Sequence, residues 1–185
     1  MIIGSKDINL RILDEDDKER WNWTGALDIT AVGVVYLLAR SSDRSKSRFL
    51  KIKITSESSI IYVEIDEQAQ DDTSLRVQND VENIDIVFYQ TCTKASEGFR
   101  ISGVGSLPYA WQNPSQTREL YVDFQYGGKI NFHSSANKYS FDNLNKITDT
   151  VFPVSRNHQI KIRAEIEIHG HTRILRFYPQ TEIEK

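Results

Sequence analysis

The sequence predicts an all-β protein organised as tandem antiparallel β-sandwich repeats. Apolar and polar residues alternate with a period of two in many short segments, and glycines or short polar turns separate these segments. No stretch of ten or more residues places apolar side chains at helical spacing between capping residues. Many short strands, each with one buried and one wetted face, are typical of a sandwich.

The first part of the chain yields one strand and one hairpin. Residues 34–39 are apolar on both faces, which predicts a central strand. Residues 49–55 and 60–65 are predicted to pair around the polar turn Ser56-Glu57-Ser58-Ser59. The one helix candidate, residues 14–20, is entirely polar, so we interpret it as an acidic surface loop.

The second part carries the strongest alternation. Residues 84–89 are rich in β-branched and aromatic side chains, which favours a strand. Residues 120–124 and 129–132 flank a Gly-Gly pair that suits a tight hairpin turn. From Ile160 to Ile168 every second residue is apolar and the intervening ones are charged, and after Gly170 the pattern resumes over 172–178. These segments predict another hairpin.

Composition excludes several classes of function. The 185 residues carry 23 basic and 26 acidic side chains, a net charge of −3 without the clustered basic excess of a nucleic-acid-binding protein. No run of about 18 apolar residues predicts a membrane span, and residues 1–10 contain no signal-peptide pattern. The single Cys92 excludes an internal disulfide framework and a cysteine-based zinc cluster. We therefore expect a cytoplasmic protein.

The chain shows an internal repeat. At a shift of 95 residues, apolar positions and one glycine coincide: Leu27, Ile29, Gly33, Val35 and Leu37 fall on Val122, Phe124, Gly128, Ile130 and Phe132. At a shift of 114 the next hairpin coincides: Ile52, Ile54, Ile61 and Val63 fall on Ile166, Ile168, Leu175 and Phe177. The polar residues 133–159 between these blocks are predicted to be an inserted surface loop. Chance similarity between two β-hairpins is the alternative explanation.

The repeat predicts two domains in an excerpt of a longer array. Residues 1–72 would be the later half of one β-sandwich repeat, and residues 73–185 the complete repeat that follows. The first copy lacks a counterpart of residues 75–114.

Those residues carry a family resemblance. Leu75-Arg76-Val77-Gln78-Asn79 precedes the strand Ile84 to Gln90, and Leu107-Pro108-Tyr109-Ala110-Trp111-Gln112-Asn113-Pro114 precedes a strand that begins at Leu120. This order resembles the repeat of the adaptor-binding domain in the vacuolar protein sorting-thirteen family of bridge-like lipid-transfer proteins. Asn9-Leu10-Arg11 and Trp21-Asn22-Trp23-Thr24 resemble further elements of the repeat. Gln112 departs from the usual signature, which has Asp at that position.

The resemblance implies a non-catalytic protein-interaction module without a cofactor. Members bind proline-x-proline motifs of organelle adaptor proteins, chiefly through the last repeats, and thereby recruit the lipid-transfer protein to membrane contact sites. Membrane association would then be indirect and peripheral, through the adaptors. The polar insertion and the end Tyr178-Pro179-Gln180 suggest the end of the array.

Strand addition is the simplest way in which a β-sandwich recognises an extended peptide, because edge backbone supplies hydrogen bonds and side-chain pockets supply specificity. Asn79 is interpreted as a structural residue that pins loop backbone. The aromatic residues have core packing as their alternative role. The residues predicted to bind the peptide or to shape its groove are Asn79, Phe88, Tyr89, Gln90, Tyr109, Trp111 and Pro114.

A second hypothesis is a β-sandwich that docks on membrane lipids or glycans. A glycan platform would use exposed aromatic rings, with Trp21 and Trp23 as candidates. No catalytic or metal site is predicted, since His169-x-His171 lacks further ligands and Cys92 is expected to be a small buried residue.

Overall fold

The computed structural model describes residues 6–13, 20–127, 129–132, 138–144, 146–155 and 158–180. The prediction of a nearly all-β fold is confirmed: the described residues form strands and one 3-10 turn, η1 (Ala95–Glu97). None of the described helical segments is long and apolar enough to span a membrane. The acidic residues 14–17 and His133 lie outside the described residues.

The chain divides into two compact units. Unit 1 comprises Met1–Thr73 and Tyr109–Thr117, and unit 2 comprises Ser74–Pro108 and Arg118–Lys185. The chain therefore passes from unit 1 to unit 2, returns to unit 1 for nine residues, and ends in unit 2. The returning segment contains the Tyr-Ala-Trp motif.

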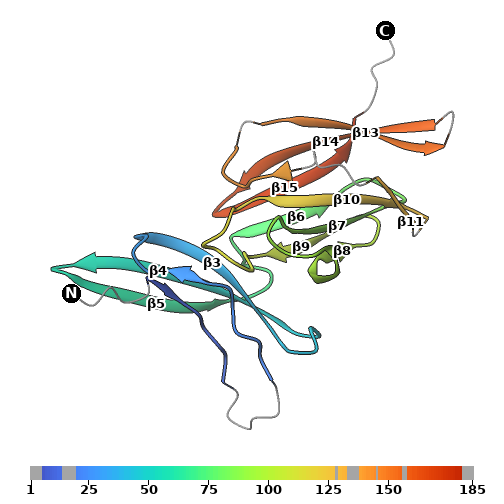
Figure 1. Ribbon diagram of the computed structural model, residues 1–185. Coiled ribbons are helices and arrows are strands. Elements are labelled where there is room, and N and C mark those ends of the chain that lie inside the picture. Colours follow the sequence, from blue (N-terminus) through green and yellow to red (C-terminus); the bar gives the residue numbers. More distant parts are fainter. Residues whose placement is uncertain are drawn as a thin grey trace. The chain divides into compact units, whose positions relative to one another are not determined.

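Unit 1 is built on a three-stranded sheet of order β3-β4-β5 and a two-stranded ribbon, β1-β2 (Figure 1). The strands are β1 (Asp7–Ile8), β2 (Leu27–Asp28), β3 (Gly33–Arg40), β4 (Ser47–Glu57) and β5 (Ile60–Gln68). The predicted β4–β5 hairpin is present with longer strands, and its turn is the residue pair Ser58 and Ser59, both at positive φ. Two residues at positive φ are the conformation of the tight hairpin turn that matches strand twist.

The core of unit 1 lies on one face of this sheet. Leu37, Ile52 and Ile54 are fully buried there, and Trp21 and Leu27 pack against them. Beside β3 runs the returning segment, because Trp111 forms a parallel bridge with Leu37. β3, which was predicted to be a central strand, is the edge strand of the three-stranded sheet. It nevertheless has a backbone partner on each side, β4 on one and the returning segment on the other.

Unit 2 is a sandwich of two five-stranded sheets. One sheet has the order β11-β10-β7-β8, with β12 also paired to β10, and the other has the order β13-β14-β15-β6-β9. Its strands are β6 (Leu75–Asn79), β7 (Ile84–Gln90), β8 (Phe99–Ile101), β9 (Gly105–Tyr109), β10 (Leu120–Tyr126), β11 (Lys129–Phe132), β12 (Lys138–Tyr139), β13 (Thr148–Ser155), β14 (His158–His169) and β15 (Thr172–Pro179). The β10–β11 and β14–β15 hairpins are confirmed, and β15 pairs with β6 in parallel.

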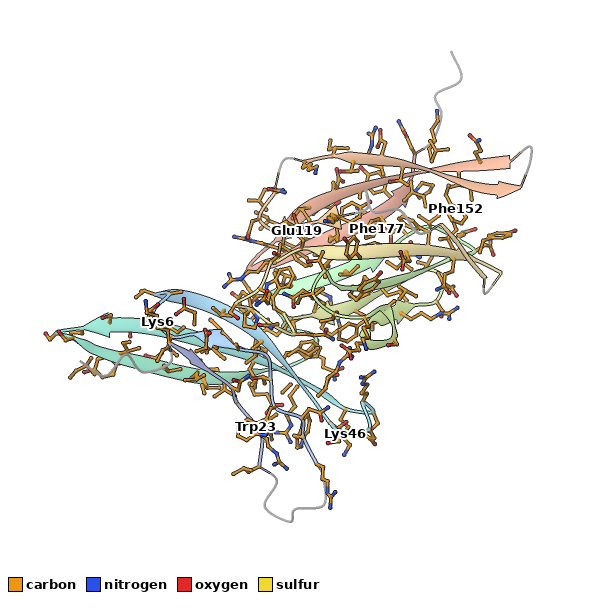
Figure 2. All side chains as sticks on the ribbon, in the orientation of Figure 1. Lys6, Trp23, Lys46, Glu119, Phe152 and Phe177 are labelled. Atoms are coloured by element: carbon orange, nitrogen blue, oxygen red, sulfur yellow. The ribbon has the colours of Figure 1, made fainter. Side chains whose placement is uncertain are left out.

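Aromatic side chains join the two sheets. The ring of Phe124 on β10 lies 5.7 Å from that of Phe177 on β15 and 6.1 Å from that of Phe152 on β13. Phe152 and Phe177 are labelled in Figure 2. Along one side of the sandwich β11 contacts β13. The other side carries β8 and β9, the opposite edges of the two sheets, which residues 102–104 connect. We call this β8–β9 side the open side.

The prediction that residues 133–159 form a surface loop is wrong for the part that the structure describes. β12 and β13 lie in this segment, and Tyr139, Phe141 and Phe152 are buried. From Thr148 to Phe152 the chain alternates inward Thr150 and Phe152 with outward Asp149 and Val151, and threonine is common in strands. Polar composition therefore concealed a strand with period-two alternation.

The internal repeat has a different register from the predicted one. The turn residues Ser58-Ser59 and Gly170-His171 occupy the same place in their hairpins, which sets the shift at 112 residues rather than 114. With this register β4 corresponds to β14 and β5 to β15. β3 then corresponds to β13, which pairs with β14 as β3 pairs with β4, and not to β11 as the sequence suggested.

Candidate functional site

Asn79 pins the backbone at one end of the unit 2 sandwich. It ends β6, is fully buried, and donates through Nδ2 to the carbonyl oxygens of Ile84 at 2.7 Å and Gly103 at 2.8 Å. Its Oδ1 accepts from the N–H of Val81 at 3.2 Å. One side chain thus satisfies the β6–β7 turn and the β8–β9 connection together, which is what a buried amide with two donors can do.

The β8–β9 connection is held from a second direction by Asp85. Its carboxylate accepts from the N–H of Gly103 at 2.9 Å and from the Arg100 guanidinium. Hydrogen bonds from Arg100 and then Gly103 lower the pKa of Asp85. Gly103 has a φ of 65°, a left-handed conformation that favours glycine. Both polar backbone groups of this residue are therefore fixed at the open side.

A third polar group extends the fixed region along β6. Asp80 accepts from Gln78 at 2.9 Å and from Arg176, and Arg176 also donates to Glu167 at 2.8 Å. The pKa of Glu167 is lowered, chiefly by the hydrogen bond that it accepts from Arg176. These charges connect the end of β6 with β14 and β15.

Phe88, Tyr89 and Gln90 lie on β7 and are all buried. Phe88 stacks on Phe99 of β8 at 5.5 Å, so it supports the open side from the interior. Tyr89 packs against Tyr121 at 5.7 Å; burial, followed by its interactions with Asp123, raises its pKa. The Gln90 carbonyl accepts from Thr93 and closes the turn after β7.

Tyr109, Trp111 and Pro114 belong to unit 1, where they too are buried. The Tyr109 and Trp111 rings meet edge to face at 5.3 Å. The N–H of Trp111 donates to the Tyr36 carbonyl at 3.0 Å, and its carbonyl accepts from Leu38 at 2.9 Å. This segment is an integral part of the unit 1 fold.

The structure thus sorts the seven predicted residues into two groups. Asn79, Phe88, Tyr89 and Gln90 lie in unit 2, with Asn79 and Gln90 at opposite ends of β7, and the other three lie in unit 1. All seven are buried, so each contributes to the position of the surrounding backbone and not to the exposed surface.

Asp85, Arg100 and Gly103 were not predicted from the sequence. Gly103 belongs to none of the motifs predicted from the sequence, and Asp85 is an ordinary outward residue of the strand predicted over residues 84–89. What links these residues is the contact of a strand carboxylate with a glycine distant in sequence. This contact forms only when β7 and β8 pair, so no local sequence pattern indicates it.

Two expectations about single residues are wrong. Trp21 is 3% exposed and Trp23 65%, so the two rings do not form an exposed glycan platform. Arg48 lies over the Trp21 ring at 5.2 Å and helps to cover it. Cys92 is exposed rather than buried, because it lies in the turn that the Gln90–Thr93 hydrogen bond closes.

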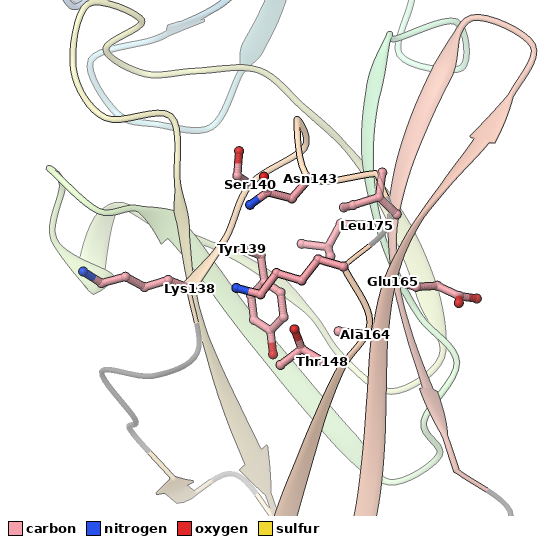
Figure 3. Close-up of a pocket in the computed structure, with 10 residues that line it drawn as sticks. Lys138, Tyr139, Ser140, Asn143, Thr148, Ala164, Glu165 and Leu175 are labelled. Carbon is pink, nitrogen blue, oxygen red and sulfur yellow. The ribbon is translucent and has the colours of Figure 1, made fainter.

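Metal chemistry finds no support in the described residues. They contain no group of three or more His, Cys, Asp or Glu side chains placed to hold an ion, and His169 contacts Glu167 at 2.9 Å. A pocket beside β12 has room for about one water molecule, and Tyr139 points toward Thr148 inside it (Figure 3). Among the described strands, β8 and β9 each pair with one neighbour only, so the open side is a candidate site for a ligand that binds through backbone groups.

Comparison with known families places the chain beside one of them by its sequence. The family model for the adaptor binding domain of vacuolar-sorting associated protein 13 matches residues 3–118. The matched part contains all of unit 1 that the structure describes and the strands β6 to β9 of unit 2, and it ends just before β10. No curated protein matches the chain.

Proposed function

The chain belongs to the adaptor-binding domain family of vacuolar-sorting associated protein 13, a family of non-catalytic binding modules within a lipid-transfer protein, and from this we propose that it binds proline-x-proline motifs of organelle adaptors by strand addition. The adaptors would recruit the lipid-transfer protein to membrane contact sites. The protein would then associate with organelle membranes peripherally, from the cytoplasm.

The observation that carries the strand-addition proposal is the open side of unit 2. Among the described strands, β8 pairs only with β7 and β9 only with β6, so each has an unpaired edge. Edge backbone groups without partners are the usual template for an added strand. The connection between the two strands is the Gly103 turn that Asn79 and Asp85 fix. An edge whose conformation is fixed before the peptide binds lowers the entropic cost of binding.

The spacing of the two prolines suits an edge strand. In an extended peptide, residues i and i+2 direct their backbone groups to the same side. The two prolines, which have no N–H, therefore remove donors from one side of the peptide and leave the other side intact. The intervening residue keeps its N–H on the other side, where it can pair with the protein. Prolines on the outer side also prevent a further strand from adding. The motif is thus complementary to an edge that accepts one peptide.

Asn79→Ala tests the proposal. We expect the affinity for a proline-x-proline peptide to fall at least about tenfold, because the carbonyls of Ile84 and Gly103 lose their common donor and the open side deforms. Isothermal titration calorimetry measures the affinity, and circular dichroism checks that the variant is folded. Asn143→Ala is the matched control, since Asn143 is an exposed asparagine of the same unit.

The peptide provides an independent test of strand addition. N-methylation of the residue between the two prolines removes the one donor that can pair with the edge, so binding should be lost. Equal affinity of Asn79→Ala and the unchanged protein would show that Asn79 does not shape the groove. Equal affinity of the methylated peptide would show that binding does not proceed by strand addition.

A further inference from the structure

β5 of unit 1 has an open edge with exposed apolar side chains. Among the described strands it pairs only with β4, although it is nine residues long. On the face that carries the unit 1 core, Ile61 is 41% exposed and Ile65 is 49% exposed. On the neighbouring strand Ile52, the partner of Ile65, and Ile54, the partner of Val63, are fully buried. The core thus continues to the edge of the sheet and ends uncovered there.

The backbone of the same residues faces the open edge. In a hairpin with a two-residue turn, the pair next to the turn exchanges hydrogen bonds, and the hydrogen-bonded pairs then alternate. The first pair here is Glu57 and Ile60, so Ile60, Tyr62 and Glu64 bond to β4. Ile61, Val63 and Ile65 therefore direct their N–H and carbonyl groups away from β4. Apolar side chains and unpaired backbone coincide along this edge.

Unit 2 shows what such an edge binds. β15, the counterpart of β5, pairs in parallel with β6, and the N–H of Arg173 donates to the Ser74 carbonyl at 2.9 Å. At the other end the Phe177 carbonyl accepts from Asp80 at 2.7 Å. In the register of the two turns, Arg173 corresponds to Ile61 and Phe177 to Ile65. The groups that hold β6 in unit 2 are thus the groups that β5 leaves open in unit 1.

The side chains of β6 fit β5 as well. Leu75, Val77 and Asn79 are buried toward the core, and Arg76 is the outward residue between the first two. Moved onto β5, Leu75 and Val77 would lie beside Ile61 and Val63. In unit 2 Arg76 pairs with Ile174, which corresponds to Tyr62 of β5. Arg76 would therefore lie beside Tyr62 and within reach of Glu64, two residues farther along β5.

We propose that the open edge of β5 binds a parallel strand from a further repeat of this kind. The strand would carry apolar side chains at alternate positions and a basic side chain between them, as β6 does. Charge favours this occupant: β5 contains Glu64, Asp66 and Glu67 and no basic residue, and the ion pairs of Glu64 with Lys53 and of Glu67 with Arg48 are exposed ones that a further basic side chain can join. A second copy of β5 would place like charges across the new pair.

The test uses a peptide with the sequence of residues 73–81, which contains β6, and the whole chain. Hydrogen exchange should show slower exchange at the amides of Ile61, Val63 and Ile65 when the peptide is bound. A peptide with serine at the positions of Leu75 and Val77 should bind at least about tenfold more weakly, since it cannot cover the apolar edge. Binding is measured by fluorescence anisotropy of labelled peptides.

Ile65→Glu, at a half-exposed position on the core face, should weaken binding of the β6 peptide at least about tenfold. Ile60→Glu is the matched control, because Ile60 is 54% exposed on the same strand but on the other face, and it should leave binding unchanged. Proline-x-proline peptides should bind both variants as they bind the unchanged chain. The β5 proposal can therefore fail while adaptor binding stands, and the reverse.

Three results would overturn the proposal. One is absence of binding by the β6 peptide at millimolar concentration. Another is exchange protection without peptide that grows with protein concentration, which would identify a second copy as the occupant of β5. The third is faster exchange around Asn79 when the peptide is added, which would mean that the peptide displaces β6 from β15 instead of binding β5.

Discussion

The β4–β5 hairpin of unit 1 and the β14–β15 hairpin of unit 2 have the same turn length and register but very different burial. At corresponding positions Ile65 is 49% exposed, whereas Phe177 is fully buried. Phe177 lies between the sheets and beside β6, and Ile65 has no strand beyond it among the described residues. Burial of a hairpin face is therefore decided by what packs on it and pairs beside it, not by the hairpin.

Both units contain three antiparallel strands in the same order, β3-β4-β5 in unit 1 and β13-β14-β15 in unit 2. The two units extend these three strands at opposite edges. In unit 1 the returning segment pairs beside β3, through Trp111 and Leu37. In unit 2 the strand β6 pairs beside β15. Each unit thus has an extension at an edge where the other unit pairs with no further strand among the described ones. A repeat of this kind is completed by segments that are not contiguous with its hairpin.

The largest expected effect is a difference in the free energy of unfolding between matched substitutions in these two hairpins. Phe177→Ala should lower the free energy of unfolding of unit 2 by about 3–5 kcal/mol, because it empties the space between the sheets. Ile65→Ala, its counterpart in unit 1, should cost less than about 1 kcal/mol, since the side chain is half exposed and a smaller apolar area is lost. Urea denaturation of both variants measures the difference.

Equal costs for the two substitutions would contradict the comparison. A large cost for Ile65→Ala would mean that its side chain is covered in solution, and the proposed open edge of β5 would then be occupied. A small cost for Phe177→Ala would mean that the sandwich of unit 2 can close over the missing ring.

The returning segment of unit 1 gives the next effect. Gly25 donates to the Gln112 carbonyl at 3.1 Å, and a methyl group at Gly25 would stand 2.4 Å from that oxygen and 2.6 Å from the Asn113 Cα. Gly25→Ala should therefore push the segment off and destabilise unit 1 by about 1–3 kcal/mol. Gly105→Ala in unit 2 is the control, because its new methyl group would meet only Ile101 at 3.2 Å.

Hydrogen exchange locates the effect of Gly25→Ala. Amides of β3, including that of Leu38, which donates to Trp111, should exchange faster, while β14 and β15 remain unchanged. Loss of protection in β14 instead would contradict the assignment of residues 109–117 to unit 1.

Hairpins could be predicted from the sequence because their signals are local. In β14 the alternation of isoleucine with charged residues indicates both a strand and its buried face. The turn Ser58-Ser59 has no glycine, yet flanking alternation placed it within the correct four residues. β13 escaped prediction because its inward positions Thr148 and Thr150 are polar, and only Phe152 indicates burial.

The candidate site could be predicted in part. Asn79 and Trp111 were recognised from their motifs, and Asn79 does pin loop backbone as expected. The partners of these residues are distant in sequence: Gly103 is 24 residues beyond Asn79, and Trp111 pairs with Leu37. Contacts of this kind depend on how the strands assemble, and no local pattern encodes them. The parallel pairing of β6 with β15 escaped prediction for the same reason.

The smallest expected effect concerns acid pH. The pKa of Asp85 is lowered by Arg100 and by the Gly103 N–H, and that of Asp149 is lowered chiefly by Arg163, from which it accepts at 2.8 Å. A carboxylate with a depressed folded-state pKa stabilises the fold above its unfolded pKa of about 3.9, and this stabilisation is lost as the pH falls through the folded value. Both pairs are partly exposed, so solvent screens them and the contribution of each is small.

Asp85→Ala should nevertheless reduce stability at pH 7 more than Asp149→Ala, because Asp85 alone also holds a backbone N–H of the open side. Urea denaturation at pH 7, 5 and 3 should show both differences shrinking toward acid pH. Equal losses for the two variants would mean that the Gly103 hydrogen bond adds nothing to the ion pair. In that case Asn79, and not the carboxylate, would be the sole side chain that fixes the β8–β9 connection.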